Sequence, residues 1–407
     1  MNFAELDLFT DEALETPWPI HQALRDAGPA TYLPRHDVWV VPRYADVRAT
    51  LKEWPEFTSR YGVCVGSEFN QLFSDSLLTT DPPRHTQLSK VFRERLSPGA
   101  LRGVAADIQA RADEMVAALV SEGEFDAITD LSDRFPVEVV ADLVGLPQEG
   151  REHLRRRAAA AFNVFGPNNE RTKLSMEDLA GIDKYMRTSS GRDQLVPGSF
   201  GMALYESVDR GDLADVDVRP LMQAYLIAGM DTTVNALGSA IWLLTEHPDQ
   251  WELLRDDPLL VPGAFDEALR LESPVMGFAR TVVNGRAVGG VEIPGGQRVL
   301  PLLGSANRDE RHWENPATFD ITRDNSGQMA FGFGLHACTG RVLANIEGHA
   351  VLHALIRQVR SITATEPITR RINNQIRGLG SLRVRVTPVS ARETQLATST
   401  TGGEERT

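Results

Sequence analysis

The feature that most constrains the fold is a long apolar segment at the centre of the chain, residues 215–247. Between Leu226 and Thr245, apolar side chains occupy nearly every face that a helix would present. A helix with an apolar surface all round is stable only when other parts of the protein surround it. The segment therefore predicts a helix of roughly 30 residues, about 45 Å long, that runs through the centre of the molecule.

The segments around this helix are mostly helical, with short strands near both ends of the chain. Apolar residues recur with helical spacing in 98–123 and in 135–146, where Pro147 lacks the amide proton that a continuing helix needs. Strand-like patterns occupy 37–44, 281–303 and 383–386. We find no internal repeat and no linker. We therefore expect one large domain over residues 1–390, mainly α with small β-sheets, followed by a disordered tail over 391–407.

Composition and charge exclude several classes of protein. The 407 residues are 42% hydrophobic and 24% charged, which suits a large core and not a disordered chain. A net charge of −14 opposes binding to nucleic acid. The N-terminus has neither a signal peptide nor an apolar run that would span a membrane, so we expect a cytoplasmic monomer without membrane contacts. The two cysteines, Cys64 and Cys338, are too few for a disulfide framework.

The most informative segment is the glycine-rich loop FGFGLHACTG at 331–340. Its glycines allow the backbone to approach a large flat ligand, and Cys338 lies where the next predicted helix, about 340–359, begins. The amides and the dipole at a helix N-terminus lower the pKa of a cysteine thiol. They favour the thiolate, which is the form that binds a metal.

Three other interpretations of this loop are weaker. A dinucleotide-binding motif needs a third glycine at a different spacing and a better strand before it. Zinc needs about four ligands, whereas His336 and Cys338 supply two. A cysteine hydrolase that pairs Cys338 with a histidine remains a remote alternative, because His336 lies before the helix and no known nucleophile signature occurs.

The loop resembles the F-G-x-G-x-H-x-C-x-G haem loop of the cytochrome P450 superfamily. Two further landmarks of that family occur in the same order: EALR at 267–270 resembles its E-x-x-R helix, and AGMDTT at 228–233 resembles the oxygen-binding groove of its central helix. The likeness covers nearly the whole chain outside the tail. It implies the P450 fold, haem b held by an axial Cys338 thiolate, and an enzyme that inserts one oxygen atom of O2 into a small molecule.

The resemblance also implies a role for residues of each landmark. The expected cofactor contacts are His85, Ala228, Gly229, Arg280, Phe331, Gly332, His336, Cys338 and Gly340, of which His85, Arg280 and His336 would bind the haem propionates. Asp231 and Thr232 would deliver protons for O–O cleavage, and Thr232 is expected to turn its hydroxyl onto a backbone carbonyl. A structural ion group is expected from Glu267, Arg270 and Arg323.

The chain departs from the family pattern at Ser89. Most bacterial relatives carry an arginine four residues after the histidine that corresponds to His85, and that arginine contacts a propionate. Here Ser89 is followed by Lys90. Either one propionate contact is missing, or Lys90 makes it.

Within the family, the chain most resembles the para-methoxybenzoate O-demethylases, for example in FNVFGPNNE at 162–170 and LGSANRDERHW at 303–313. The arginines that help to hold the substrate carboxylate in that branch have no counterpart in 69–78 or 223–227, although Arg84 is an alternative cation. We therefore expect the substrate to be a neutral aromatic or larger apolar molecule. The enzyme would hydroxylate or O-demethylate it. The expected lining residues are Phe69, Leu77, Phe162, Phe165, Gln223, Tyr225, Ile227, Met276 and Phe278.

The resemblance implies an electron donor as well. No flavin or iron–sulfur segment is found in the sequence, so we expect electrons from a separate ferredoxin served by an NAD(P)H-dependent ferredoxin reductase. A basic stretch on which an acidic ferredoxin would dock is formed by Arg84, Lys90, Arg93 and Arg95, against Glu94 alone. The alternatives are a haem-binding protein without turnover and a peroxide-driven peroxygenase, and the Asp231–Thr232 pair argues against both.

Overall fold

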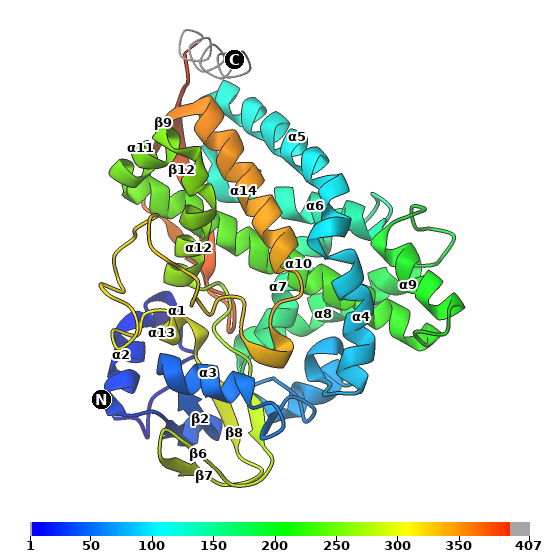
Figure 1. Cartoon of the computed structure of the whole chain (residues 1–407), viewed down its shortest axis with the longest axis vertical. Coiled ribbons are helices and arrows are strands. Elements are labelled where there is room, and N and C mark those ends of the chain that lie inside the picture. The colour runs from blue at the N-terminus through cyan, green and yellow to red at the C-terminus, as the bar shows by residue number, and fades with distance from the viewer. Residues whose placement is uncertain (1, 391–407) are drawn as a thin grey trace, which may run out of the picture.

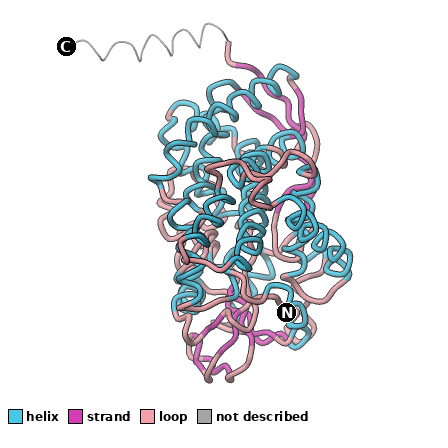
Figure 2. The backbone as a smooth tube through the Cα atoms, turned by 90° about the vertical axis from the view of Figure 1, so that its right-hand side faces the viewer, coloured by secondary structure: helices cyan, strands magenta, loops and turns pink. Residues whose placement is uncertain are grey.

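The apolar central segment forms a single helix, α10 (Asp215–Glu246), which crosses the middle of the molecule (Figure 1). The computed structural model describes residues 2–390, so the predicted tail lies outside the described residues. Helices α6, α7, α12 and α14 pack around α10, and α14 also packs along α5. The prediction of a mainly α fold with small sheets is confirmed within this range (Figure 2).

The other helices are α1 (Asp11–Glu15), α2 (Trp18–Ala27), α3 (Tyr44–Lys52), α4 (Arg84–Arg95), α5 (Pro98–Glu122), α6 (Phe135–Val144), α7 (Leu154–Val164), α8 (Glu170–Ser189), α9 (Phe200–Asp209), α11 (Pro248–Asp256), α12 (Val261–Glu272), α13 (Leu303–Ala306) and α14 (Arg341–Gln358). Short helical turns that matter for the site are η2 (Ser67–Phe73), η3 (Leu77–Thr79) and η7 (Gly334–His336). None of the helices in residues 2–390 combines the length and the apolar character needed to cross a membrane.

The strands are β1 (Thr31–Leu33), β2 (Val38–Val41), β3 (Phe57–Thr58), β4 (Glu124–Asp126), β5 (Arg280–Val282), β6 (Arg286–Val288), β7 (Val291–Ile293), β8 (Arg298–Pro301), β9 (Val359–Ala364), β10 (Thr369–Arg371), β11 (Gly378–Ser381) and β12 (Arg383–Pro388). The largest sheet has the order β1-β2-β8-β5-β3, with β2 and β8 parallel and the other neighbours antiparallel. It lies with α2 and α3 at the lower end of the molecule in Figure 1.

Three predicted boundaries need correction. Helix α6 ends at Val144, before Pro147, because Gly145 adopts a left-handed conformation (φ 84°) and its N–H closes the helix on the Ala141 carbonyl. The strand predicted over 37–44 is only Val38–Val41, because Tyr44 already begins α3. The segment 281–303 contributes to two sheets, since β6 and β7 pair separately from β5 and β8.

Candidate functional site

Two glycines shape the loop that presents Cys338. Gly332 and Gly334 have φ values of 67° and 76°, in the left-handed region that other residues rarely adopt. A side chain at Gly334 would also lie 2.4 Å from the carbonyl oxygen of Leu51 in α3. The Cys338 N–H donates to the Phe331 carbonyl at 2.8 Å, which closes the loop. The Cys338 side chain itself stays exposed.

The electrostatics of this thiol differ from the sequence-based expectation. Although solvent reaches the side chain, the protein that surrounds it raises the pKa of the Cys338 thiol by desolvation, and the backbone N–H groups of Gly340 and Arg341 lower it only in part. The helix start therefore acts in the predicted direction, but the surrounding protein outweighs it. A positive metal ion bound to the sulfur would supply the missing stabilisation of the thiolate.

A strip of accessible surface interrupts the otherwise buried helix α10. Ala228 is exposed between the buried Ile227 and the half-buried Gly229, and Thr232, one turn later, is half-buried. The Thr232 hydroxyl donates to the Ala228 carbonyl at 2.7 Å, in the geometry predicted for it. Gly229 serves packing, because an added Cβ would approach Val140 of α6 to 3.3 Å.

Asp231 lies beside this strip but is almost completely buried, with 1% of its surface exposed. Its Oδ1 accepts a hydrogen bond from Asn235 at 3.3 Å and lies 3.5 Å from Nη2 of Arg155, whereas Oδ2 has no partner. Burial raises the pKa of Asp231 to about 6, against the opposing effect of Arg155.

Arg155 extends the ionic contacts of Asp231 away from α10. Its Nε donates to Asp133 at 2.9 Å, and Arg371 binds the same Asp133 carboxylate at 3.0 Å. Acids and bases thus alternate along the series Asp231, Arg155, Asp133 and Arg371. Sequence reasoning missed Arg155, because its contact with α10 joins residues far apart in the chain.

The three residues expected to bind propionates come together. The rings of His85 and His336 lie 4.6 Å apart between centroids, and the charge of Arg280 is close enough to lower the pKa of His336, after the larger effect of burial. Arg280 is 4% exposed, and within residues 2–390 its guanidinium donates hydrogen bonds to the carbonyls of Phe278 and Ala279. His85 Nδ1 and His336 Nε2 are buried, and neither has a hydrogen-bond partner in the part of the chain that the structure describes. The group also contains Asp81, which sequence reasoning missed; its Oδ1 lies 3.9 Å from His336.

At the position of the missing arginine, Ser89 is completely buried and its hydroxyl donates to the Thr86 carbonyl at 3.3 Å. Lys90 instead forms an ion pair with Asp212 at 3.1 Å. The guanidinium of Arg93, one turn beyond Ser89, reaches back and donates to the same Thr86 carbonyl at 3.4 Å. It therefore lies beside the small Ser89 side chain, and its charge helps to lower the pKa of His85 to about 4, after burial and His336.

The predicted structural ion group is fully formed. Arg270 donates to both carboxylate oxygens of Glu267, at 2.7 and 2.8 Å, and both side chains are 0% exposed. Arg323 donates to Glu267 at 3.1 Å. Arg323 lies in the loop that precedes residues 331–340, so this ion group joins that loop to α12.

The residues expected to line the substrate pocket fall into separate groups. Phe165 contacts both Phe162 and Phe278, with ring centroids 5.8 and 5.4 Å apart, and it also contacts Phe73 at 4.3 Å, which sequence reasoning missed. Tyr225 belongs to another aromatic group, stacked on Phe200. Phe69, Leu77, Gln223, Met276 and Phe278 are half-buried, while Phe162, Phe165, Tyr225 and Ile227 are buried.

A second buried acid, Glu347 in α14, was also missed. It is 0% exposed, and neither carboxylate oxygen has a hydrogen-bond partner among residues 2–390. Burial raises the pKa of Glu347 well above its usual range, which favours the protonated acid, and Thr233 opposes this effect only in part. A lone glutamate in a helix gives no sequence signal for such a state.

The predicted basic stretch on α4 is largely neutralised. Arg84 pairs with Asp217, Lys90 with Asp212, and Arg95 with Glu206. These acids belong to α9, α10 and the loop between them, so they are far from α4 in sequence. The stretch is therefore less positive than its own sequence indicates.

Comparison with known proteins identifies the family. A model of the family "Cytochrome P450" matches residues 255–380. The chain is also 41% identical to cytochrome p450 CYP199A2 of Rhodopseudomonas palustris over 391 residues, which cover 94% of this chain and 93% of the relative. The chain belongs to the cytochrome P450 family. A second relative, the beta-dihydromenaquinone-9 omega-hydroxylase of Mycobacterium bovis, is 30% identical over 95% of this chain and 80% of its own.

Solved P450 structures have the same fold. The structure of CYP109E1 from Bacillus megaterium in complex with testosterone aligns with a TM-score of 0.83 and 25% identity, over 92% of this chain and 99% of that one. CYP109Q5 from Chondromyces apiculatus aligns with a TM-score of 0.81 and 28% identity, over 96% of this chain and all of that one. The predicted superfamily and fold are therefore confirmed.

Proteins of the P450 family bind haem b through an axial cysteine thiolate, and the described residues fit this cofactor. An exposed thiol on a glycine-rich loop suits an iron ligand. The accessible strip at Ala228 and Thr232 interrupts the buried helix α10 and leaves a surface against which a flat cofactor would pack. The unpartnered nitrogens of His85 and His336, together with Arg280, suit two propionate carboxylates.

The raised pKa of Asp231 predicts a pH-dependent effect of Asp231→Asn on stability. Because the folded-state pKa is about 6 and the reference value is 3.8, folding favours the protonated acid, and this contribution is lost as the pH rises through 6. Relative to wild type, the variant should gain on the order of 3 kcal/mol in free energy of unfolding between pH 4 and pH 7.5. Chemical denaturation of the haem-loaded proteins at both pH values measures the change.

The control for this experiment is Thr232→Ala, which alters the adjacent position without removing a titrating group. Its effect on stability should be the same at both pH values. A constant difference between Asp231→Asn and wild type would show that folding does not raise the pKa of Asp231.

Proposed function

We propose that this P450 is a monooxygenase that inserts one oxygen atom of O2 into an aromatic or otherwise apolar small molecule, by hydroxylation or oxidative O-demethylation. The observation that supports this best is the buried Asp231, with its unpartnered oxygen and a pKa near 6, beside the Thr232 hydroxyl. A protein that only binds haem has no use for such a pair. Groups with strongly shifted pKa values concentrate where proton transfer takes place.

The cofactor contacts are proposed from the same geometry. Haem b bound through the Cys338 thiolate supplies the iron that activates O2. Phe331, Gly332 and Gly340 shape the loop around Cys338, and Ala228 and Gly229 provide a helix surface without large side chains. His85, Arg280 and His336 hold the propionates by charge-assisted hydrogen bonds.

Arg93 is proposed to replace the arginine that the chain lacks at position 89. Its guanidinium lies beside Ser89, where the side chain of an arginine at 89 would otherwise extend. Lys90 is engaged by Asp212 instead. The small Ser89 side chain leaves room for Arg93, so a cation from the next helical turn serves the same propionate.

Proton handling is proposed for Asp231 and Thr232. The Oδ2 atom of Asp231 has no partner, so it is free to take up or release a proton near neutral pH. Thr232 uses its hydrogen on the Ala228 carbonyl, which leaves the lone pairs of its oxygen available to accept a hydrogen bond. Arg155 positions the carboxylate and links it to Asp133.

The substrate is proposed to be neutral. Arg84, the alternative cation for a carboxylate, is paired with Asp217 at the start of α10. Gln223 and Ile227 carry no positive charge, although they occupy positions where the related O-demethylases would place some of the polar side chains that bind the substrate carboxylate. Burial of an unpaired carboxylate costs several kcal/mol, which corresponds to a large loss in affinity.

Electrons are proposed to come from a ferredoxin and its NAD(P)H-dependent reductase. The α4 surface remains the proposed docking region, although its arginine and lysine side chains share their charge with acids of α9 and of the α9–α10 loop. Docking there would depend on shape as well as on charge. A monomeric state and a cytoplasmic location stay predictions from the sequence.

The proposed function predicts the behaviour of two variants. The reduced, carbon monoxide-treated protein should show the red-shifted Soret band of thiolate-bound haem, and Cys338→Ala should lose it. Thr232→Ala should retain the band and substrate binding, yet divert reducing equivalents from product to hydrogen peroxide. Product formed per NAD(P)H, with a ferredoxin and its reductase supplied, measures this. Wild-type coupling in Thr232→Ala would contradict the proton-handling role.

The role of Arg93 predicts faster loss of haem from Arg93→Gln. Loss of one charge-assisted hydrogen bond at a partly exposed site should accelerate transfer of haem to excess apomyoglobin roughly three- to tenfold. Lys90→Gln is the matched control on the same helix and should release haem at the wild-type rate.

A double variant separates this role from a general effect on α4. Ser89→Arg introduced together with Arg93→Gln should restore haem retention, because the arginine at position 89 would then supply the cation that binds the propionate. If Arg93→Gln retains haem as wild type does, Arg93 is not a propionate contact.

The neutral-substrate proposal predicts the outcome of a spin-state titration. Para-methoxybenzoate should bind more weakly than its methyl ester, by at least about tenfold. Gln223→Arg, which places a cation at the head of the groove helix, should raise the affinity for the acid more than for the ester. Tight binding of the acid to wild type, with weak binding of the ester, would instead indicate the usual substrate of the related O-demethylases.

A further inference from the structure

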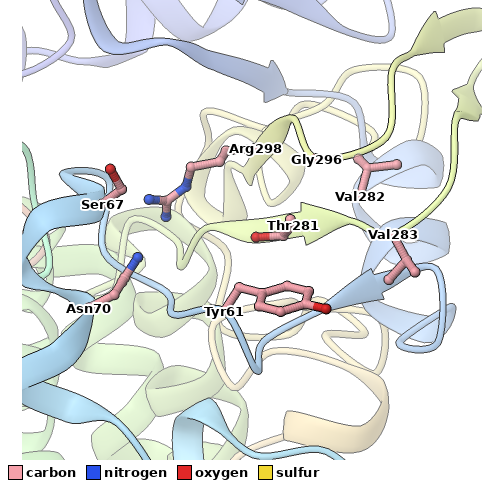
Figure 3. A pocket seen from close by; sticks show the side chains of 8 residues that line it. All are labelled: Tyr61, Ser67, Asn70, Thr281, Val282, Val283, Gly296 and Arg298. Atoms are coloured by element: carbon pink, nitrogen blue, oxygen red, sulfur yellow. The ribbon is translucent and has the colours of Figure 1, made fainter.

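A pocket of about 430 Å³ lies on the outer side of the largest sheet, between β5, β8 and the turn η2. Figure 3 shows its polar side chains: Arg298 from β8, Thr281 from β5, Ser67 and Asn70 from η2, and Tyr61 from the loop before η2. None of these residues belongs to the proposed haem site or to the expected substrate-lining set. The pocket is thus lined by residues to which the proposed reaction assigns no role.

Strand register explains why an arginine faces this pocket. Arg280 pairs with Val299 and Thr281 pairs with Arg298 in the antiparallel ladder of β5 and β8. Successive residues of a strand point to opposite faces, so Thr281 and Arg298 share one face while Arg280 points to the other. The sheet therefore directs Arg280 inward to the His85–His336 group and Arg298 outward into the pocket.

Arg298 is an incompletely paired cation. Its Nη2 donates to the Cys64 carbonyl, but Nε and Nη1 are shielded from solvent and have no hydrogen-bond partner. Among the described residues, no carboxylate lies within ion-pair distance of it; Asp37 and Glu68 act on it only from farther away. Burial lowers the pKa of Arg298, which shows that the surrounding protein compensates its charge poorly.

The neighbouring groups are hydrogen-bond donors as well. Asn70 Oδ1 accepts the Cys64 N–H at 3.0 Å, which fixes the amide and leaves its NH2 group free. In Figure 3 the guanidinium of Arg298 lies between Ser67 and Asn70, and the amide nitrogen of Asn70 is turned toward it. Donors that face one another in this way repel unless an acceptor lies between them.

We propose that this pocket binds a small oxyanion, the carboxylate or phosphate group of an organic molecule. Arg298 supplies the charge through a guanidinium whose Nε and Nη1 are shielded and unpaired, and the Asn70 amide and the Ser67 and Thr281 hydroxyls supply hydrogen bonds to the anion. Val283, which follows on the same face as Thr281 and is exposed, provides an apolar surface for the rest of the ligand. A neutral ligand would leave the guanidinium charge uncompensated, so the anionic group is what the pocket selects.

Calorimetric titration of the haem-loaded protein tests the proposal, with sodium acetate and sodium phosphate as probes at constant ionic strength. Wild type should show saturable binding of at least one probe, without a change in the haem spectrum. Arg298→Gln should lower that affinity at least about tenfold. Arg286→Gln is the matched control, because Arg286 is an exposed arginine of the nearby β6 that pairs with Glu53. The tighter of the two probes identifies the ligand as carboxylate or phosphate.

A second variant keeps the test decisive if Arg298→Gln folds poorly. Ser67→Asp places a carboxylate at the rim of the pocket, where it should pair with Arg298, raise the melting temperature in the absence of added anion, and abolish binding of the probe. The proposal is overturned if neither probe binds wild type saturably, or if both variants bind the probe as tightly as wild type does.

Discussion

The buried ion group of Glu267, Arg270 and Arg323 holds the part of the chain on which the candidate site depends. The segment from residue 307 to residue 330 contains no regular helix or strand, so its backbone groups need other partners. Arg270 donates to the carbonyls of Asn307, Pro316 and Thr318, and Arg323 donates to those of Glu314 and Asn315. An ion pair shielded from water at this point fixes a long irregular connection, and that connection sets where the cysteine loop begins.

The site distributes charge in a way that matches its proposed chemistry. On one side, Arg280, His85 and His336 gather around the single carboxylate of Asp81, and within the described chain one nitrogen of each imidazole has no hydrogen-bond partner. On the other side, burial beside α10 raises the pKa of Asp231 to about 6, and Arg155 and Asn235 oppose this effect only in part. Burial acts on both sets of groups, since a low-dielectric environment penalises whichever form is charged. One set of groups is thereby suited to bind anions, and the other to exchange protons.

Patterns along the sequence predicted those parts of the fold whose causes are local. The central helix follows from an apolar surface on every face, and the left-handed turns of the loop follow from Gly332 and Gly334. The contacts of Asp231 with Arg155, and of Phe165 with Phe73, join residues that no periodicity relates. The neutralised basic stretch on α4 has the same explanation, because the acids that pair with it come from elements far along the chain: Glu206, Asp212 and Asp217.

The proposed cofactor contacts are widely spaced along the chain: His85 lies in α4, Ala228 in α10, Arg280 in β5 and Cys338 before α14. Cys338 belongs to the last fifth of the 407 residues. During synthesis, the earlier elements therefore leave the ribosome long before the iron ligand exists. The apolar central helix is buried only after α12 and α14 have been synthesised. Haem binding and completion of the hydrophobic core therefore occur together, late in folding.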